Sequence, residues 1–226
     1  MKFFTIKRPT AYSSEQMNSY TIGTRAYGAN VGDAVRCSAC RRHLSMLTWL
    51  PPYRIEIECM GTAYSDIIEI GREIIVSERV VRVLLDNSIT GLSKFEPVVI
   101  VKVVHRRGFA TEPLPKYFTA TVCHSQTAID QVASRYVWDD HAKVCPECLM
   151  DGTLLRHRGL FVMENTWAGE DVFYPRGGNG PLVTERFKSV VEGNRLTGLV
   201  FTPSGEEIND FFPWITGERT GTGGPA

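Results

Sequence analysis

The sequence carries no excess of either charge. Its 226 residues include 25 Lys and Arg and 25 Asp and Glu, so the formal net charge at pH 7 is zero. A protein that binds nucleic acid usually has a basic surplus that neutralises phosphates, and an acidic mimic of nucleic acid would have the opposite surplus. The balance therefore argues against nucleic acid as the partner, and it identifies no other partner.

Long apolar runs are also missing. The longest is Val98–Val101, which ends at Lys102, far short of the roughly 18 residues that a membrane-spanning helix requires. The N-terminus has a lysine but lacks the hydrophobic region of a signal peptide. We expect no membrane association and a cytoplasmic location. Since 43% of the residues are apolar and 22% are charged, we expect a globular protein.

Cysteine is sparse, and its distribution is uneven. Four of the six cysteines form two Cys-x-x-Cys pairs, Cys37/Cys40 and Cys145/Cys148. In a reducing compartment this spacing favours a metal over disulfides. Four thiolates match a closed, tetrahedral structural zinc site. Because 104 residues separate Cys40 from Cys145, the zinc would join two distant parts of the chain.

Other interpretations of the pairs remain open. His43 or His141 would allow a mixed Cys/His site, and the cysteines could also be ordinary thiols without a metal. A redox pair is less consistent with the sequence, because such pairs normally begin a helix in a thioredoxin-like unit. Cys59 and Cys123 stand alone on apolar segments and are predicted to be small buried residues.

Two blocks of sequence recur at a constant spacing. Residues 74–80 reappear as 181–187, and 87–92 reappear as 194–199, both shifted by 107 positions. We interpret this as a diverged tandem duplication. The predicted fold is α+β: two pseudo-repeats, each a Cys-x-x-Cys knuckle followed by a strand–helix–strand unit, packed as one compact protein. The predicted boundaries are 1–110, 111–215 and a disordered tail at 216–226.

The repeated blocks contain the signals of two helices. Ser77 and Thr184 are predicted N-caps, because their hydroxyls can accept a backbone N–H of the first turn. Apolar residues then recur at helical spacing and predict one buried stripe on each helix. These stripes are Val80, Val83 and Leu84 in the first helix and Phe187, Val190 and Val191 in the second. Arg79 and Arg186 are predicted to reach a carboxylate or carbonyl across the contact between the halves.

No sequence motif assembles an active site. The glycine-rich segment at 177–181 has neither the Gly-Lys-Ser/Thr of a phosphate loop nor a G-x-G-x-x-G pattern, and it is predicted to be a turn. The nucleophile elbow G-x-S-x-G and the zinc motif H-E-x-x-H are also missing. We therefore predict that the protein is not an enzyme.

These motifs together resemble a known family. The N-terminal Met-x-Phe-Phe, the two distant Cys-x-x-Cys knuckles and the closing segments at 171–173, 182–187 and 196–201 are similar to the double-CxxCG-motif immunity proteins of bacteria. The resemblance covers most of the chain and is strongest in its last third. The family has a glycine after each pair, which eases a tight turn, whereas this sequence has Arg41 and Leu149.

The resemblance implies a function and a cofactor. It implies an antitoxin that neutralises a cognate bacterial toxin by stoichiometric binding, with structural zinc held by the four cysteines. Because aromatic and Arg side chains dominate protein interfaces, candidate contacts are Trp167, Tyr174, Arg176 and Trp214. An alternative is a zinc-stabilised nucleic-acid-binding or regulatory module, for which Arg41-Arg42 and Arg106-Arg107 are the hints. The oligomeric state stays open.

Overall fold

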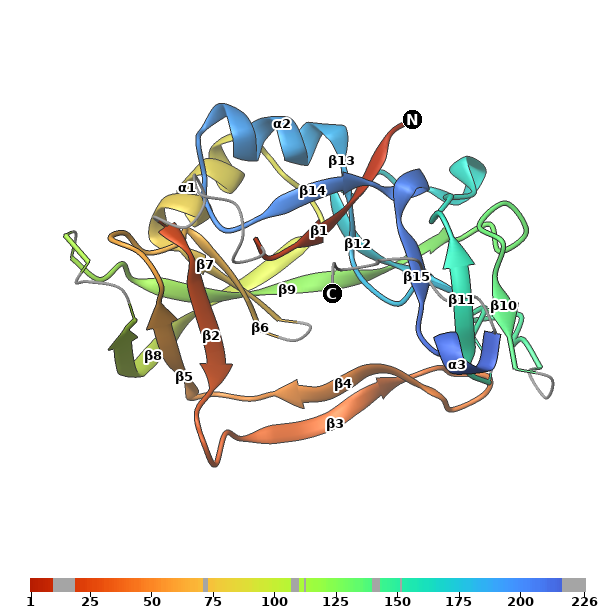
Figure 1. Ribbon diagram of the computed structural model, residues 1–226, viewed down its shortest axis with the longest axis horizontal. Coiled ribbons are helices and arrows are strands. Elements are labelled where there is room, and N and C mark those ends of the chain that lie inside the picture. The colour runs from red at the N-terminus through yellow and green to blue at the C-terminus, as the bar shows by residue number, and fades with distance from the viewer. Residues whose placement is uncertain are drawn as a thin grey trace, which may run out of the picture.

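The computed structural model describes residues 1–9, 19–70, 73–106, 110–111, 113–139, 143–150 and 152–216 (Figure 1). Its strands are β1 (Phe3–Lys7), β2 (Thr21–Arg25), β3 (Val31–Arg36), β4 (His43–Trp49), β5 (Tyr53–Cys59), β6 (Ile67–Ile70), β7 (Glu73–Ser77), β8 (Leu92–His105), β9 (Tyr117–Ala128), β10 (Val137–Trp138), β11 (Leu154–Arg158), β12 (Val172–Arg176), β13 (Leu182–Thr184), β14 (Val200–Pro203) and β15 (Ile208–Asp210). Its helices are α1 (Glu78–Asp86), α2 (Glu185–Gly193) and α3 (Pro213–Thr216).

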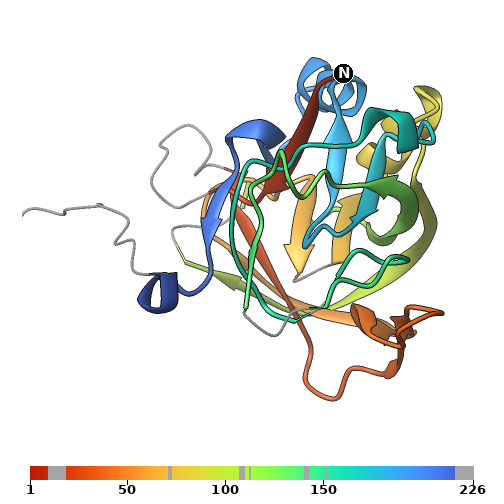
Figure 2. The same ribbon diagram turned by 90° about the vertical axis from the view of Figure 1, so that its right-hand side faces the viewer.

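One large mixed sheet dominates the described part of the chain. It contains ten strands, eight of them in the order β14-β1-β13-β12-β9-β8-β5-β2, with β7 pairing β9 and β6 pairing β7. The pairs β5/β8 and β9/β12 are parallel, and the other strand pairs of the sheet are antiparallel. The sheet curls, so its ends turn toward each other (Figure 2).

The predicted α+β class is wrong. Strands account for 45% of the residues that the structure describes and helices for 14%, so this part of the protein is mostly β. Two separate strand–helix–strand repeats with small sheets of their own are not formed, because strands from both ends of the chain join the same sheet. β1 shows this directly: it lies between β13 and β14, and Phe4 pairs with Val183 on one side and Pro203 on the other.

Two smaller sheets accompany the main one. β10, β11 and β15 form a three-stranded sheet, and β3 and β4 form a two-stranded hairpin. In Figure 1 this hairpin runs along the lower side of the molecule, and its far end approaches the small sheet. The hairpin is the element that carries the first cysteine pair.

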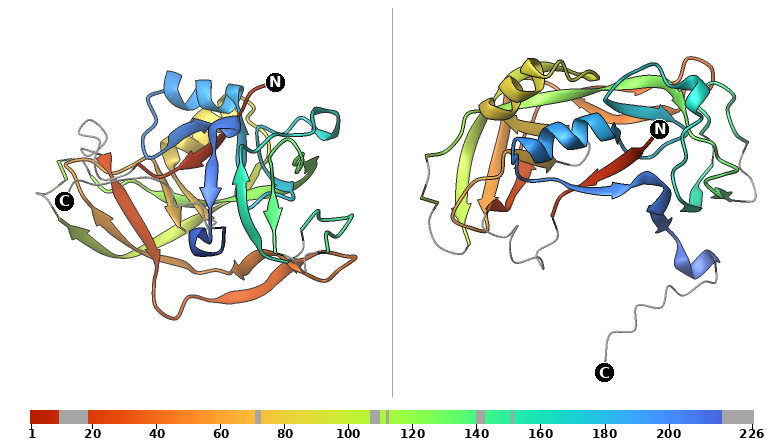
Figure 3. Two further views of the ribbon diagram at one scale, coloured as in Figure 1. Left: turned by 45° about the vertical axis from the view of Figure 1, so that its right-hand side comes forward. Right: turned by 90° about the horizontal axis from the view of Figure 1, so that it is seen from above.

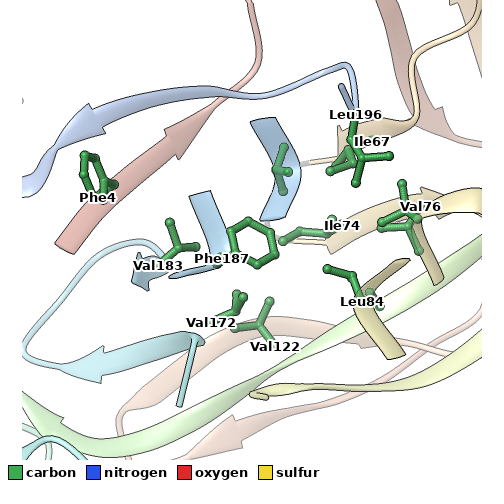
Figure 4. Close-up of a cluster of buried hydrophobic side chains, with 13 residues drawn as sticks. Phe4, Ile67, Ile74, Val76, Leu84, Val122, Val172, Val183, Phe187 and Leu196 are labelled. Atoms are coloured by element: carbon green, nitrogen blue, oxygen red, sulfur yellow. The ribbon is translucent and has the colours of Figure 1, made fainter. Parts of the chain in front are cut away.

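The two longer helices form where the sequence predicts them. Ser77 Oγ accepts the N–H of Val80, and Thr184 Oγ1 accepts the N–H of Phe187, so both predicted N-caps are confirmed. Val80 and Leu84 of α1 and Phe187 and Val191 of α2 point into one shared core (Figure 4). Val190, also predicted for the second stripe, is half-buried and is not part of that core. That core contains Phe4, Ile67, Ile74, Val76, Val80, Leu84, Ala120, Val122, Val172, Val183, Phe187, Val191 and Leu196. Val83 packs against it and is only partly buried.

Two carboxylates connect the regions around α1 and α2, of which Asp171 is buried and Asp66 is half-buried. Asp66 Oδ1 accepts from Ser77 Oγ at 3.0 Å, and its Oδ2 accepts the N–H of Thr197 at 3.1 Å. Asp171 repeats this arrangement with Thr184 Oγ1 at 2.8 Å and the N–H of Thr90 at 3.0 Å. The carboxylates therefore join α1 and α2, which lie close together in both views of Figure 3.

The two arginines after the caps make the predicted cross-contacts. Arg79 bonds Asp66 in its own unit and the carbonyl of Asn194 after the opposite helix. Arg186 bonds Asp171 and the carbonyl of Asn87 in the same way. The prediction that these arginines reach a carbonyl across the contact is confirmed, and they complement the C-terminal ends of the partner helices.

Within the described residues, no helix has the length and apolar character needed to cross a membrane. The predicted disordered tail at 216–226 lies outside these residues except for Thr216, where α3 ends.

Candidate metal centre

The first cysteine pair lies in the turn of the β3–β4 hairpin. The chain folds back between Arg36 and His43, so Cys37 and Cys40 lie at the hairpin tip. The N–H of Arg41 donates to the carbonyl of Cys37 at 3.0 Å, and the N–H of Cys37 donates to the carbonyl of Arg42 at 2.9 Å. These two hydrogen bonds close a tight turn over the six residues 37–42, which we call a knuckle, and they place both thiols on one side of it.

The second pair repeats this knuckle in a loop. The N–H of Leu149 donates to the carbonyl of Cys145 at 2.8 Å, and the N–H of Cys145 donates to the carbonyl of Met150 at 3.4 Å. Leu149 has φ 57° and Arg41 has φ 61°, both in the left-handed region that favours glycine. These are the two positions where the resembled family has glycine, so the tight turn forms with larger residues in both places.

The fold brings all four thiols together. Cys37 Sγ lies 4.0 Å from Cys145 Sγ, and Cys40 Sγ lies 3.7 Å from Cys148 Sγ. The four sulfur atoms lie within 4.8 Å of one another, and none is in a disulfide. Zn–S bonds of about 2.3 Å at tetrahedral angles place sulfur atoms about 3.8 Å apart. The cluster therefore has the donor set and the spacing to bind a metal ion.

Burial and backbone hydrogen bonds make the thiols unequal. The N–H of Cys40 points to Cys37 Sγ and lowers the pKa of the Cys37 thiol to about 7. The N–H of Cys148 likewise lowers the pKa of the Cys145 thiol. Burial raises the pKa of the Cys148 thiol to about 12. Thiolates are the ligand form of cysteine, so the first cysteine of each pair is the more readily ionised ligand.

Side chains around the cluster hold the two knuckles in place. Arg42 donates from the hairpin to the carbonyl of Gly152 at 3.0 Å, a direct bond between the two parts. Arg176, at the end of β12, donates to the carbonyl of Glu147 at 3.1 Å. Gln131 donates to the carbonyl of Leu149. The second knuckle is thus attached to the main sheet, and the first docks onto it.

Histidine does not complete the cluster in the described part of the chain. His43 is exposed and does not join the group of possible ligands, which consists of the four cysteines. His141 lies outside the described residues. Cys59 is fully buried, as predicted, whereas Cys123 is only half-buried.

The four predicted contact residues do not form one surface. Trp167 packs edge-on against Phe3 at 6.0 Å between ring centroids, and its N–H donates to the carbonyl of Glu170. Tyr174 and Arg176 line one cavity beside the cysteines. Trp214 lies in α3 and is 76% exposed. Of the four, only Tyr174 and Arg176 are neighbours. Choosing aromatic and arginine residues from the sequence therefore did not locate a single interface.

No protein-family model matches this sequence, and no curated protein sequence matches it. The motifs and the geometry of the fold therefore carry the functional inference.

Proposed function

We propose that this protein is a zinc-stabilised immunity protein, which neutralises a cognate bacterial toxin by stoichiometric binding. The observation that carries the proposal is the gathering of Cys37, Cys40, Cys145 and Cys148 into one four-thiol cluster. The resemblance to double-CxxCG-motif immunity proteins implies this arrangement. Two cysteine pairs with 104 residues between them would not by themselves have to come together in the fold.

Zinc is the metal that suits this donor set. Four thiolates at tetrahedral spacing are typical of structural zinc, and such a site leaves no ligand position open for a substrate. Its contribution is to fix the hairpin tip against the body of the protein. The proposed zinc cluster therefore stabilises the fold and takes no part in a reaction. The toxin would bind to the protein surface that the cluster holds in place.

The structure offers less support to the nucleic-acid alternative. Arg106, one of its hints, donates two hydrogen bonds to Glu58, at 2.8 and 3.1 Å. Because the carboxylate of Glu58 already neutralises this guanidinium, Arg106 has little positive charge to offer a nucleic-acid phosphate. Arg107 lies outside the described residues.

Co-expression with the product of the adjacent gene tests the function. If that product is the toxin, cells expressing it alone stop growing, and cells that also express this protein recover. The two proteins should then co-purify at a fixed ratio, because standard inhibitor interfaces bury about 1,600 Å² and are stable to purification. A harmless neighbour, or a toxic one that this protein neither neutralises nor binds, would contradict the proposal.

A further inference from the structure

One cysteine of the four-thiol cluster is open to solvent. Cys40 is exposed at the tip of the β3–β4 hairpin, whereas Cys37, Cys145 and Cys148 are each at most 8% exposed. Oxidants react with cysteine in its thiolate form and where solvent reaches it. Hydrogen peroxide is small and uncharged, so the net negative charge of a four-thiolate zinc centre does not repel it. Cys40 is therefore the cysteine of the cluster that a peroxide meets first.

The sulfur atom that faces Cys40 across the cluster belongs to the other knuckle. Cys148 Sγ lies 3.7 Å from Cys40 Sγ, and Cys145 Sγ lies 4.0 Å from Cys37 Sγ. The S–S bond of a disulfide is about 2.05 Å long, so Cys40 and Cys148 would have to approach by about 1.7 Å. Rotation of the two side chains supplies a movement of this size, and the second knuckle therefore offers a partner for an oxidised Cys40.

Contacts that involve no metal hold the two knuckles opposite each other. The N–H of Gly177 donates to the carbonyl of Cys148 at 2.9 Å, and Arg42 of the hairpin donates to the carbonyl of Gly152 at 3.0 Å. At the other end of the hairpin, Trp49 is 5% exposed and packs into a core cluster with side chains of the main sheet. Release of zinc would thus leave the sulfur atoms of the two knuckles within reach of each other.

The choice of disulfide decides what oxidation does to the fold. A bond between Cys40 and Cys148 would close a loop with 107 residues between its ends, and it would join the hairpin tip to the body as zinc does. A bond between Cys37 and Cys40 would close a loop with only two residues between its ends and leave the tip unlinked. A crosslink limits the unfolded chain more when its loop is longer. Only the bond between the knuckles can replace the metal.

We propose that Cys40 is a site of oxidation by peroxides, and that the product is a disulfide with Cys148 that replaces zinc as the link between the hairpin and the body. The proposal rests on the zinc centre of the proposed function and is independent of the identity of the toxin. It differs from a redox pair within one Cys-x-x-Cys motif, because the bond forms between the two motifs.

The oxidation takes two steps. The Cys40 thiolate attacks one oxygen of hydrogen peroxide, the O–O bond breaks and hydroxide leaves, which gives a sulfenic acid at Cys40. The Cys148 thiolate then attacks that sulfur, the S–S bond forms, the S–O bond breaks and a second hydroxide leaves. The two thiolates lose two electrons to one peroxide, and the two hydroxides take up protons from the solvent. With two of its four ligands consumed, the cluster no longer binds zinc, and a dithiol reductant restores the thiols.

Peroxide treatment of the zinc-loaded, full-length protein tests the proposal. Trypsin cleavage after Lys and Arg places the first pair in peptide 37–41 and the second in peptide 144–156. Mass spectrometry without reduction should find these two peptides joined, with fragmentation assigning the bond to Cys40 and Cys148. A chromogenic chelator should detect one zinc released per chain. The oxidised protein should melt within about 3 °C of the zinc form, whereas reduced protein treated with a chelator should melt about 10–20 °C lower.

Two serine variants test the role of the exposed thiol. Cys40→Ser should slow peroxide-induced zinc release at least fivefold, because the remaining thiols of the cluster are buried. Cys123→Ser is the matched control, since this half-buried thiol lies outside the cluster, and it should change the rate less than twofold. If Cys40→Ser does not fold or does not bind zinc, the disulfide found in the wild type decides the question.

Four outcomes would overturn the proposal. These are peptides 37–41 and 144–156 that stay separate with a disulfide inside each pair, zinc that stays bound while Cys40 stays reduced, oxidised protein that melts as low as the chelated form, and equal rates of zinc release in the two serine variants. Zinc measured before peroxide is added separates this proposal from the zinc centre itself, because only a zinc-free protein contradicts both. Failed rescue in the co-expression experiment contradicts immunity and leaves the oxidation result intact.

Discussion

Single residues with left-handed backbones limit the stability of both knuckles. Arg41 and Leu149 adopt φ values near 60°, a conformation that costs a residue with a Cβ about 1–2 kcal/mol. The strained backbone conformation persists because the two hydrogen bonds within each knuckle and the contacts around it hold the turn in place. The sequence indicated that a glycine was missing here. It did not show that the turn would form without it.

Replacing Arg41 with glycine should therefore stabilise the protein. Arg41 is exposed, so Arg41→Gly removes little packing and relieves the strained backbone, with an expected gain of up to about 1 kcal/mol. Urea unfolding measures the difference. Ala39→Gly in the same turn is the control and should give no gain, because Ala39 does not have a positive φ. A gain in the control equal to that of Arg41→Gly would contradict the explanation.

Gly91 is required where one helix unit crosses the other. It has φ +87°, and an added Cβ would overlap the carbonyl oxygen of Val172. We expect Gly91→Ala to cost about 3–5 kcal/mol, through backbone strain and overpacking. Gly28→Ala should cost only about 1 kcal/mol, because Gly28 has φ +74° with no atom within 4 Å of the new Cβ. If the two variants lost similar amounts of the free energy of unfolding, the close approach of Gly91 to the carbonyl of Val172 would not be what requires glycine.

At the scale of elements, α1 tests the buried stripe that the sequence predicted. Leu84 is 2% exposed and Leu85 is 62% exposed. Leu84→Ala should cost about 2–5 kcal/mol, because it leaves a cavity in the core shared by both helices. Leu85→Ala should change stability by less than about 0.5 kcal/mol. The free energy of unfolding in urea distinguishes them, and a near-neutral Leu84→Ala would mean that the helix face is misassigned.

Local signals predicted the helices well and the sheet poorly. The caps at Ser77 and Thr184 and the apolar spacing that follows them act within a few residues, so the sequence exposes them directly. Sheet order depends on partners far apart in the chain. That β1 would lie between β13 and β14 has no local signature. The repeated blocks wrongly suggested a small sheet in each pseudo-repeat, whereas one large sheet includes strands from both.

The same contrast applies to the site. Cys-x-x-Cys spacing identified the four clustered residues because tight knuckles need that local geometry. The exposure of Met46 and the burial of Trp49 were not predicted, since they depend on where the β3–β4 hairpin lies against the main sheet. No property of Trp167 or Trp214 in the sequence could show that they lie on different parts of the fold.

For the whole molecule, the cluster closes a long loop. The 104 residues between Cys40 and Cys145 are tied together when a metal binds, and closing a loop of about this size removes about 5 kcal/mol of unfolded-chain entropy. At about 2–4 °C per kcal/mol for a chain of this length, chelation of the metal should lower the melting temperature by about 10–20 °C. Calorimetry with and without chelator measures it. A melting temperature unchanged by complete metal removal would contradict the closing role.

The central claim is that the four cysteines bind zinc, and the metal content of the purified protein tests it most directly. Elemental mass spectrometry should find one zinc per chain in the wild type and in Cys123→Ser, whose thiol lies outside the cluster. The Cys37→Ser/Cys145→Ser variant should contain none. Wild-type protein that stays free of zinc after expression in zinc-supplemented medium, or a double variant that retains a full equivalent, would contradict the account.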